Sequence, residues 1–176
     1  MWPENNGEKG RGQKSPILLV TILITKEHIL GLASAHLKDG EIYVTGIKIG
    51  SDNQISLYID GDEGVTIQDC VGLSRAIESA LDRQKEDFSL DVSSHGATTP
   101  LVMPRQYTRH IGRNFEIRLL DGTRAEGNLV AAGENEIKIE YSNRENKPIG
   151  KGKITVVKQQ TIKYEEIKES KIKLKY

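Results

Sequence analysis

Apolar residues in the first half of the chain recur at two spacings, one typical of helices and one typical of strands. Residues 26–37 and 66–81 carry apolar side chains every three or four positions, which places them on one face of a helix. Residues 41–49, 54–60 and 88–92 alternate apolar and polar positions, as half-buried strands do. The order predicts an αββαβ unit of class α+β, in which two helices cover one three-stranded sheet.

The second half has no such helices. Short alternating segments with glycine-containing turns predict five strands, at residues 115–119, 124–130, 136–141, 153–158 and 171–175. A loose charged loop is expected at residues 143–153, and a short helical turn within 161–169. Several short antiparallel strands commonly close into a small barrel, because closure removes exposed strand edges.

The boundary between the two halves is expected just after residues 88–92. The strand there leads into Ser93-Ser94-His95-Gly96, and Pro100 and Pro104 then stiffen the path and interrupt backbone pairing. We therefore predict domains at residues 24–100 and 101–176. Residues 1–23 are expected to form a disordered or extraneous tail, since residues 1–15 are polar and rich in glycine.

Charge divides at the same boundary. Residues 26–100 contain 6 Lys and Arg against 13 Asp and Glu, whereas residues 101–176 contain 16 against 10. The chain is neutral as a whole, with 36% hydrophobic and 28% charged residues. An acidic half and a basic half bear on the choice of partners more than on the fold.

The sequence offers little for catalysis or for a cofactor. Cys70 cannot form an internal disulfide, because it is the single cysteine, and it falls on the apolar face of the second helix as a packing residue. The four histidines lack the spacing of metal ligands, and no Ser-His-Asp set can be argued. We expect no enzyme, no cofactor and no metal, and a cytoplasmic location with no membrane contact, since no stretch approaches the roughly 20 apolar residues of a span.

The basic residues of the second half are candidate RNA contacts. Arg105, Arg109 and Arg113 recur at intervals of four, which would place them on one side of a helical segment. Lys147, Lys151 and Lys153 crowd one loop. Such clusters can neutralise RNA phosphates, although lysines and arginines facing water on a solvated surface would give the same pattern.

Three motifs in order resemble the family of the ribosome maturation factor RimP. They are the helix segment at residues 68–83, the VSSHGATTPL run at 92–101, and residues 105–113 with their Arg-Gln-Tyr and Ile-Gly-Arg ends. An Asp-Gly turn follows at the expected distance, and the resemblance covers roughly residues 24–176. It implies an αββαβ domain followed by a small SH3-like or Sm-like barrel.

The resemblance also implies a function, which is to bind the free 30S small ribosomal subunit and assist its late assembly without catalysis. The expected contacts are 16S rRNA for the basic half and a ribosomal protein for the acidic half, where Asp60, Asp62 and Glu63 are candidates. The protein is expected to act as a monomer. The alternative is an oligomeric Sm-like module that binds and anneals RNA, which size-exclusion chromatography with light scattering would reveal as a ring.

Two departures from the family pattern limit what can be carried over. The family linker usually carries Pro, Leu, Asp and Arg where this chain has His95, Ala97, Thr98 and Thr99, so charged contacts there are not carried over. Residues 1–23 have no counterpart, which suggests a start codon assigned too far upstream. Peptides from residues 1–14 of the native protein in mass spectrometry would contradict that hypothesis.

Overall fold

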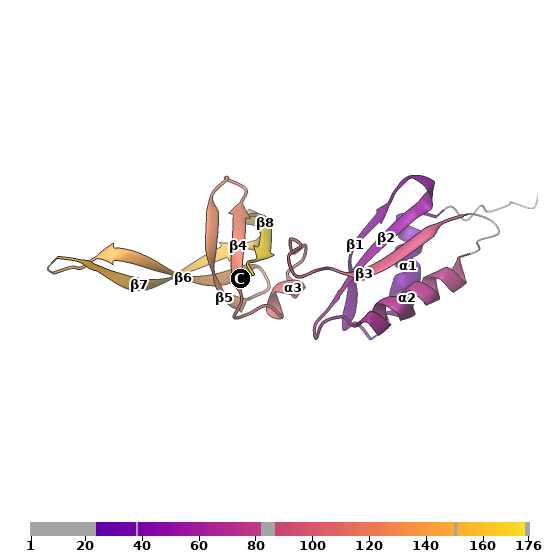
Figure 1. Cartoon of the computed structure of the whole chain (residues 1–176), viewed down its shortest axis with the longest axis horizontal. Helices are drawn as coiled ribbons and strands as arrows, with labels where there is room; N and C mark the ends of the chain where they lie inside the picture. Colours follow the sequence, from indigo (N-terminus) through magenta and orange to yellow (C-terminus); the bar gives the residue numbers. More distant parts are fainter. Residues whose placement is uncertain (1–23, 38, 82–86, 150, 175–176) are drawn as a thin grey trace, which may run out of the picture.

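The computed structural model describes residues 24–37, 39–81, 87–149 and 151–174. These residues form an elongated molecule with two separate hydrophobic cores and a short connecting segment between them (Figure 1). Residues 1–23 lie outside the described residues, so the tail predicted there stays a prediction.

The first core is built on a three-stranded sheet. Strands β1 (Ile42–Ile49) and β2 (Gln54–Gly61) form an antiparallel hairpin around the short 3₁₀ turn η1 (Ser51–Asn53). Strand β3 (Ser89–Ser94) pairs with β2 in parallel, in the order β1-β2-β3. A parallel pair needs a crossover connection, and helix α2 supplies it.

Two helices cover this sheet, α1 (Lys26–His36) and α2 (Ile67–Ala80) (Figure 1). Helix α2 begins with a capping box, in which the Thr66 hydroxyl accepts from the Asp69 backbone N–H and the Asp69 carboxylate accepts from the Thr66 N–H. Leu73 and Ile77, four residues apart, are fully buried. Cys70 packs against the same core, and burial raises the pKa of its thiol. The predicted αββαβ order is confirmed.

The second core is built on a five-stranded antiparallel sheet. A short helix, α3 (Arg105–Thr108), leads into β4 (Asn114–Leu119) and β5 (Arg124–Ala132). Then follow β6 (Glu136–Asn146), β7 (Lys153–Lys163), the 3₁₀ turn η2 (Tyr164–Glu166) and β8 (Ile167–Ile172). The strand order is β7-β6-β5-β4-β8, so α+β with two sheets describes the chain.

The core of this sheet is aliphatic with one aromatic stack. Phe115, Ile117 and Leu129 are fully buried, and the ring of Tyr107 from α3 stacks on Phe115 with centroids 5.7 Å apart. The Tyr107 hydroxyl bonds to the hydroxyl of Ser170 on β8, which is buried as well. Helix α3 is therefore fixed to the sheet that follows it.

The predicted loose loop at residues 143–153 is wrong for residues 143–146 and 153, which belong to strands. Strand β6 runs on to Asn146 and β7 already begins at Lys153, with the two strands in register down to that pair. Beyond Glu140 this ribbon has solvent on both faces, so residues 142–146 do not alternate apolar with polar side chains. The periodic signal that marks a half-buried strand was absent for that reason.

The last strand also differs from its prediction. The helical turn is confined to η2, and β8 starts at Ile167 where a start at residue 171 was expected. A register shift where β4 meets β8, between Arg118 and Leu119, interrupts the alternation, and a buried position is held by polar Ser170. Both features break the apolar–polar alternation by which a strand is recognised in a sequence.

Candidate interaction surfaces

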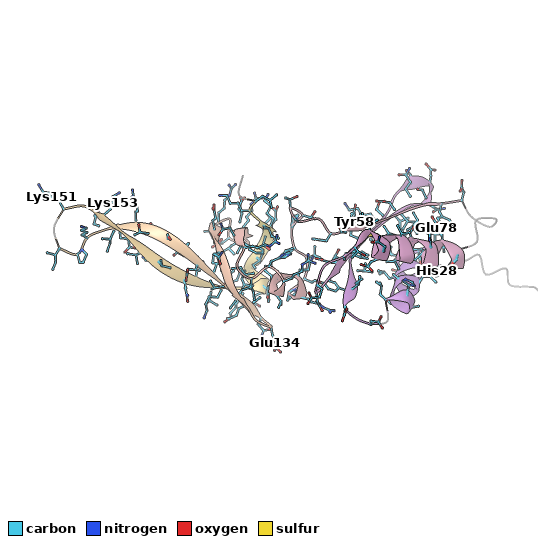
Figure 2. The ribbon with its side chains drawn as sticks, turned by 60° about the horizontal axis from the view of Figure 1, so that its bottom comes forward. His28, Tyr58, Glu78, Glu134, Lys151 and Lys153 are labelled. Atoms are coloured by element: carbon cyan, nitrogen blue, oxygen red, sulfur yellow. The ribbon has the colours of Figure 1, made fainter. Side chains whose placement is uncertain are left out.

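Two regions contain the residues singled out from the sequence, and they lie in different parts of the molecule. The first is the seam, the contact between residues 60–62 at the end of β2 and residues 105–109 around α3. The second is the arm, the part of the β6–β7 hairpin from Tyr141 to Lys158. Figure 2 shows Lys151 and Lys153 at the far end of the arm, away from the β1–β3 sheet marked by Tyr58.

Asp60 is the centre of the seam. Its side chain is buried, yet both oxygens have partners: Oδ1 accepts from the Gly61 N–H at 2.9 Å and contacts Arg109 Nη1 at 2.8 Å, while Oδ2 accepts from Gln106 Nε2 at 2.8 Å. The same Arg109 nitrogen donates to the Gly61 carbonyl at 2.7 Å. A buried carboxylate is tolerated only with such partners, so Asp60 ties α3 to β2.

A residue with a side chain would not fit at Gly61. A Cβ there would lie 2.4 Å from the Gly64 carbonyl oxygen, because the chain folds tightly back after β2. The turn leaves the Gly61 carbonyl turned toward Arg109. The local Gly-x-x-Gly spacing therefore shapes the seam.

Arg105 makes the outer contact of the seam. Its Nε donates to Asp62 Oδ1 at 2.7 Å, Nη2 bonds to the other oxygen of Asp62, and Nη2 also donates to the Gly40 carbonyl at 2.6 Å. The guanidinium lies over the Tyr43 ring at 4.5 Å. The hydrogen bond from Arg105 lowers the pKa of Asp62 and raises that of Arg105. Both side chains are about half exposed, so the ion pair itself contributes modestly to stability.

Two histidines lie beside the seam. His95 Nε2 donates to the Pro100 carbonyl at 2.9 Å, and its Nδ1 bonds to the Thr45 hydroxyl at 3.0 Å, so this residue fastens the linker to β1. Burial lowers the pKa of His110 to about 4, and the charges of Arg109 and Arg113 act in the same direction. His110 is therefore neutral at physiological pH.

A shallow cavity of about 470 Å³ opens at the seam. Its lining includes Glu63 and Arg113 together with Asp60, His95 and His110. Glu63 and Arg113 are exposed, and neither side chain forms an ion pair within the described part of the chain. Of the two predicted clusters at the seam, these are the charges that remain available to a partner.

The arm presents the predicted lysines to solvent. Lys147, Lys151 and Lys153 are exposed, and their ammonium groups make no ion pair to any other described residue. The backbone of the tip is closed by a hydrogen bond from the Lys147 N–H to the Gly152 carbonyl at 3.1 Å. The structure brings these lysines together at one end of the molecule and does not bring them near the arginines of the seam.

Sequence reasoning missed one residue of the seam, Gln106, and the two histidines beside it, His95 and His110. In the sequence, Gln106 stands out only as the middle of the Arg-Gln-Tyr motif, yet its Oε1 accepts from the Val102 N–H at 2.9 Å while its amide reaches Asp60. Its neighbours are themselves polar or charged, so no local pattern marks it as a buried contact. The departure at His95 was noticed, but its bonding could not be foreseen.

Other classes of site find no support in the described residues. None of the helices there is long and apolar enough to cross a membrane. No group of three or more His, Cys, Asp or Glu side chains gathers there in a way that could hold a metal ion.

Comparisons with known proteins all match this chain to RimP proteins. A sequence model described as the RimP N-terminal domain matches residues 37–98. The ribosome maturation factor RimP of Christiangramia forsetii is 43% identical over 139 residues, covering 79% of this chain and 90% of that protein. Its namesake from Flavobacterium psychrophilum is 41% identical over 73% of this chain and 83% of that protein. The one from Porphyromonas gingivalis is 36% identical over 67% and 78%.

Proposed function

Because this chain belongs to the RimP family of ribosome maturation factors, we propose that it binds the free 30S small ribosomal subunit and assists its late assembly without catalysis. A protein of this kind acts by binding one arrangement of RNA and protein more tightly than another, which shifts the population toward the favoured state. The proposal places the protein in the cytoplasm, where ribosomal particles assemble.

The observation that carries the proposal is the separation of unpaired charge within an elongated molecule. The exposed lysines of the arm lie at one end, and the acidic αββαβ unit lies at the other (Figure 2). Lys147, Lys151 and Lys153 are suited to 16S rRNA phosphates, and so is Arg113 beside the seam. A molecule built this way can contact RNA and a basic ribosomal protein at the same time.

The protein-binding side of the proposal concerns Asp60, Asp62 and Glu63. Asp60 and Asp62 are already paired with Arg109 and Arg105, so Glu63 is the residue of this group whose charge is available. We place the contact with a basic ribosomal protein on the surface around Glu63. Glu63→Gln removes this charge without adding a cation, so it should weaken binding to such a protein and leave binding to naked rRNA nearly unchanged.

Two structural details belong to the same proposal. The order β7-β6-β5-β4-β8, with η2 linking the two outer strands, is compatible with a sheet that coils into an SH3-like or Sm-like barrel. The two separate cores support domains at residues 24–100 and 101–176. We also propose a monomer, since lysines along the edge strand β7 disfavour pairing with another copy.

Sedimentation of the tagged protein with cell lysate in a sucrose gradient tests the function. We expect it to migrate with free small subunits and to be absent from translating ribosomes. Protein that stays at the top of the gradient, or spreads over polysomes, would contradict the proposal. Light scattering on the purified protein distinguishes this function from the alternative of an oligomeric Sm-like annealing module. Such a module would give the mass of a ring, whereas we expect the mass of a monomer.

A further inference from the structure

The arm is a two-stranded ribbon that extends past the sheet. Strand β5 pairs with β6 at residues 137–140, and from Tyr141 outward β6 pairs with β7 alone. At roughly 3.4 Å per residue, the stretch from Tyr141 to Asn146 reaches about 20 Å from the sheet. Figure 2 shows the ribbon projecting from the rest of the molecule. An isolated ribbon is costly to keep ordered and contributes nothing to the core, which indicates a role outside the fold.

The two faces of the ribbon differ in charge. Side chains alternate between faces along a strand, and directly opposite residues share a face. One face, here called the paired face, carries Glu145 and Lys158, which form an ion pair with each other. The other, called the open face, holds six residues that are all exposed: Ser142, Arg144, Asn146, Lys153, Thr155 and Val157.

The open face has cations and no acid. Arg144 and Lys153 form no ion pair within the described residues, and Lys147 and Lys151 continue the positive surface into the tip. By contrast, Glu145 neutralises the cation of the paired face. The unpaired positive charge of the arm therefore lies on the open face and at the tip, and not on the paired face.

An aliphatic side chain sits among these tip lysines. Ile149 is 90% exposed, more than any other large apolar residue whose exposure the structure gives. An exposed aliphatic group between cations fits a partner that is anionic along its backbone and apolar on some faces. Unpaired nucleotides meet both conditions, because an unstacked base exposes its flat face next to phosphates.

We propose that the open face of the arm is an RNA-binding surface, with Arg144 and Lys153 on phosphates, the tip lysines beside them, and Ile149 against an unpaired base. The inference rests on the proposed function, which supplies rRNA as the partner, and it adds Arg144 and Ile149 to the contact. An A-form duplex could meet the cations but would leave Ile149 without a partner, because its bases are stacked and its major groove is too narrow for side chains to read. The preferred target is a loop or a junction.

The test compares matched substitutions on the two faces. Arg144→Ala and Lys158→Ala each remove one cation from the ribbon, and only the first removes it from the open face. Fluorescence anisotropy with a labelled RNA stem-loop, measured over a range of salt concentrations, reports the slope of log affinity against log salt. We expect Arg144→Ala and Lys153→Ala each to reduce the slope by about 0.7, the value for one single-stranded phosphate contact, and Lys158→Ala to leave it unchanged.

Ile149→Ser tests the apolar contact by a different readout. It should weaken binding to the stem-loop several-fold at every salt concentration, leave the slope unchanged, and have no effect on binding to a blunt duplex of the same stem. Equal loss for the duplex would overturn the assignment to unpaired RNA. All four variants concern exposed side chains, and equal melting temperatures check that the fold is intact.

The outcomes separate this inference from the proposed function. If Lys158→Ala reduces the slope as much as Arg144→Ala, or if neither does, the open face is not the RNA surface, whether or not the protein sediments with small subunits. If the arm variants bind the stem-loop normally but no longer sediment with small subunits, the arm contacts a protein and the inference is overturned. Failure of the wild-type protein to sediment with small subunits contradicts the proposed function itself.

Discussion

Asp60 joins the end of β2 to the segment around α3 through one buried carboxylate. It is 4% exposed and bonded to residues more than forty positions away, Gln106 and Arg109. Alternation along β2 fixes which way a side chain points, but a partner this distant in sequence depends on tertiary packing that no local pattern encodes.

Positions on helix α2 were more predictable, because their environment is local. Cys70, Leu73 and Ile77 were placed on the buried face by spacing alone, and that face packs on the sheet. Leu73→Ala should lower the free energy of unfolding by about 2–5 kcal/mol, since the side chain is fully buried and leaves a cavity. Urea denaturation measures the change. Ile67→Ala, on the exposed side of the same helix, is the control and should change stability by less than about 0.5 kcal/mol.

His110 should make stability depend on pH. Its pKa is about 4 in the folded protein, against 6.5 for a histidine in water, so the unfolded chain binds a proton more readily. Stability from this residue is therefore full above pH 6.5 and is lost as the pH falls toward 4, by at most about 3 kcal/mol. Urea midpoints over this pH range should fall for the wild type, and less for His110→Gln. His36→Gln, at an exposed site, should behave as the wild type; a similar effect there would rule out His110 as the source.

At the scale of elements, the sequence predicted the helices and strands that have one buried face. It failed for the end of β6, where both faces are exposed. The αββαβ unit was predicted in the right order, because one face of each of its elements is apolar. The sequence predicts a loop instead of a strand at residues 143–146 of the arm, since neither face of the ribbon is buried along residues 142–146. Pairing there is held by cross-strand hydrogen bonds, which any residue except proline can supply.

The arm should be removable without harm to the fold. Tyr141 and Lys158 lie directly opposite each other, so an Asn-Gly turn can join them in place of residues 142–157. The second core draws its β6 and β7 side chains from Ile137, Ile139 and Ile162, all retained. We expect an unchanged melting temperature and a loss of RNA binding, measured by calorimetry and by anisotropy. A large drop in melting temperature would mean that the arm supports the sheet.

At the scale of the whole molecule, the seam connects the three-stranded sheet to the segment that leads into the five-stranded sheet. The run of arginines predicted for RNA supplies three side chains with different surroundings. Arg105 and Arg109 bond to Asp62 and Asp60, while Arg113 has no acidic partner within the described residues. The interval of four was visible in the sequence, but which member meets a carboxylate depends on where β2 ends relative to α3. The RNA role predicted for Arg105 and Arg109 stays a prediction. To bind these two side chains, RNA phosphates would have to displace the carboxylates of Asp62 and Asp60.

Arg109→Ala and Arg113→Ala form a matched pair that tests which arginine stabilises the seam and which one binds RNA. Arg109→Ala leaves the buried Asp60 carboxylate without its cation, so it should lower the free energy of unfolding by about 1–3 kcal/mol. It should also broaden the range of orientations between the two sheets seen in small-angle X-ray scattering, while the salt slope of RNA binding stays the same. Arg113→Ala should do the reverse, with unchanged stability and a slope lower by about 0.7. If Arg109→Ala instead flattens the slope and leaves stability and scattering unchanged, Arg109 leaves Asp60 to grip RNA, and the seam opens when the subunit is bound.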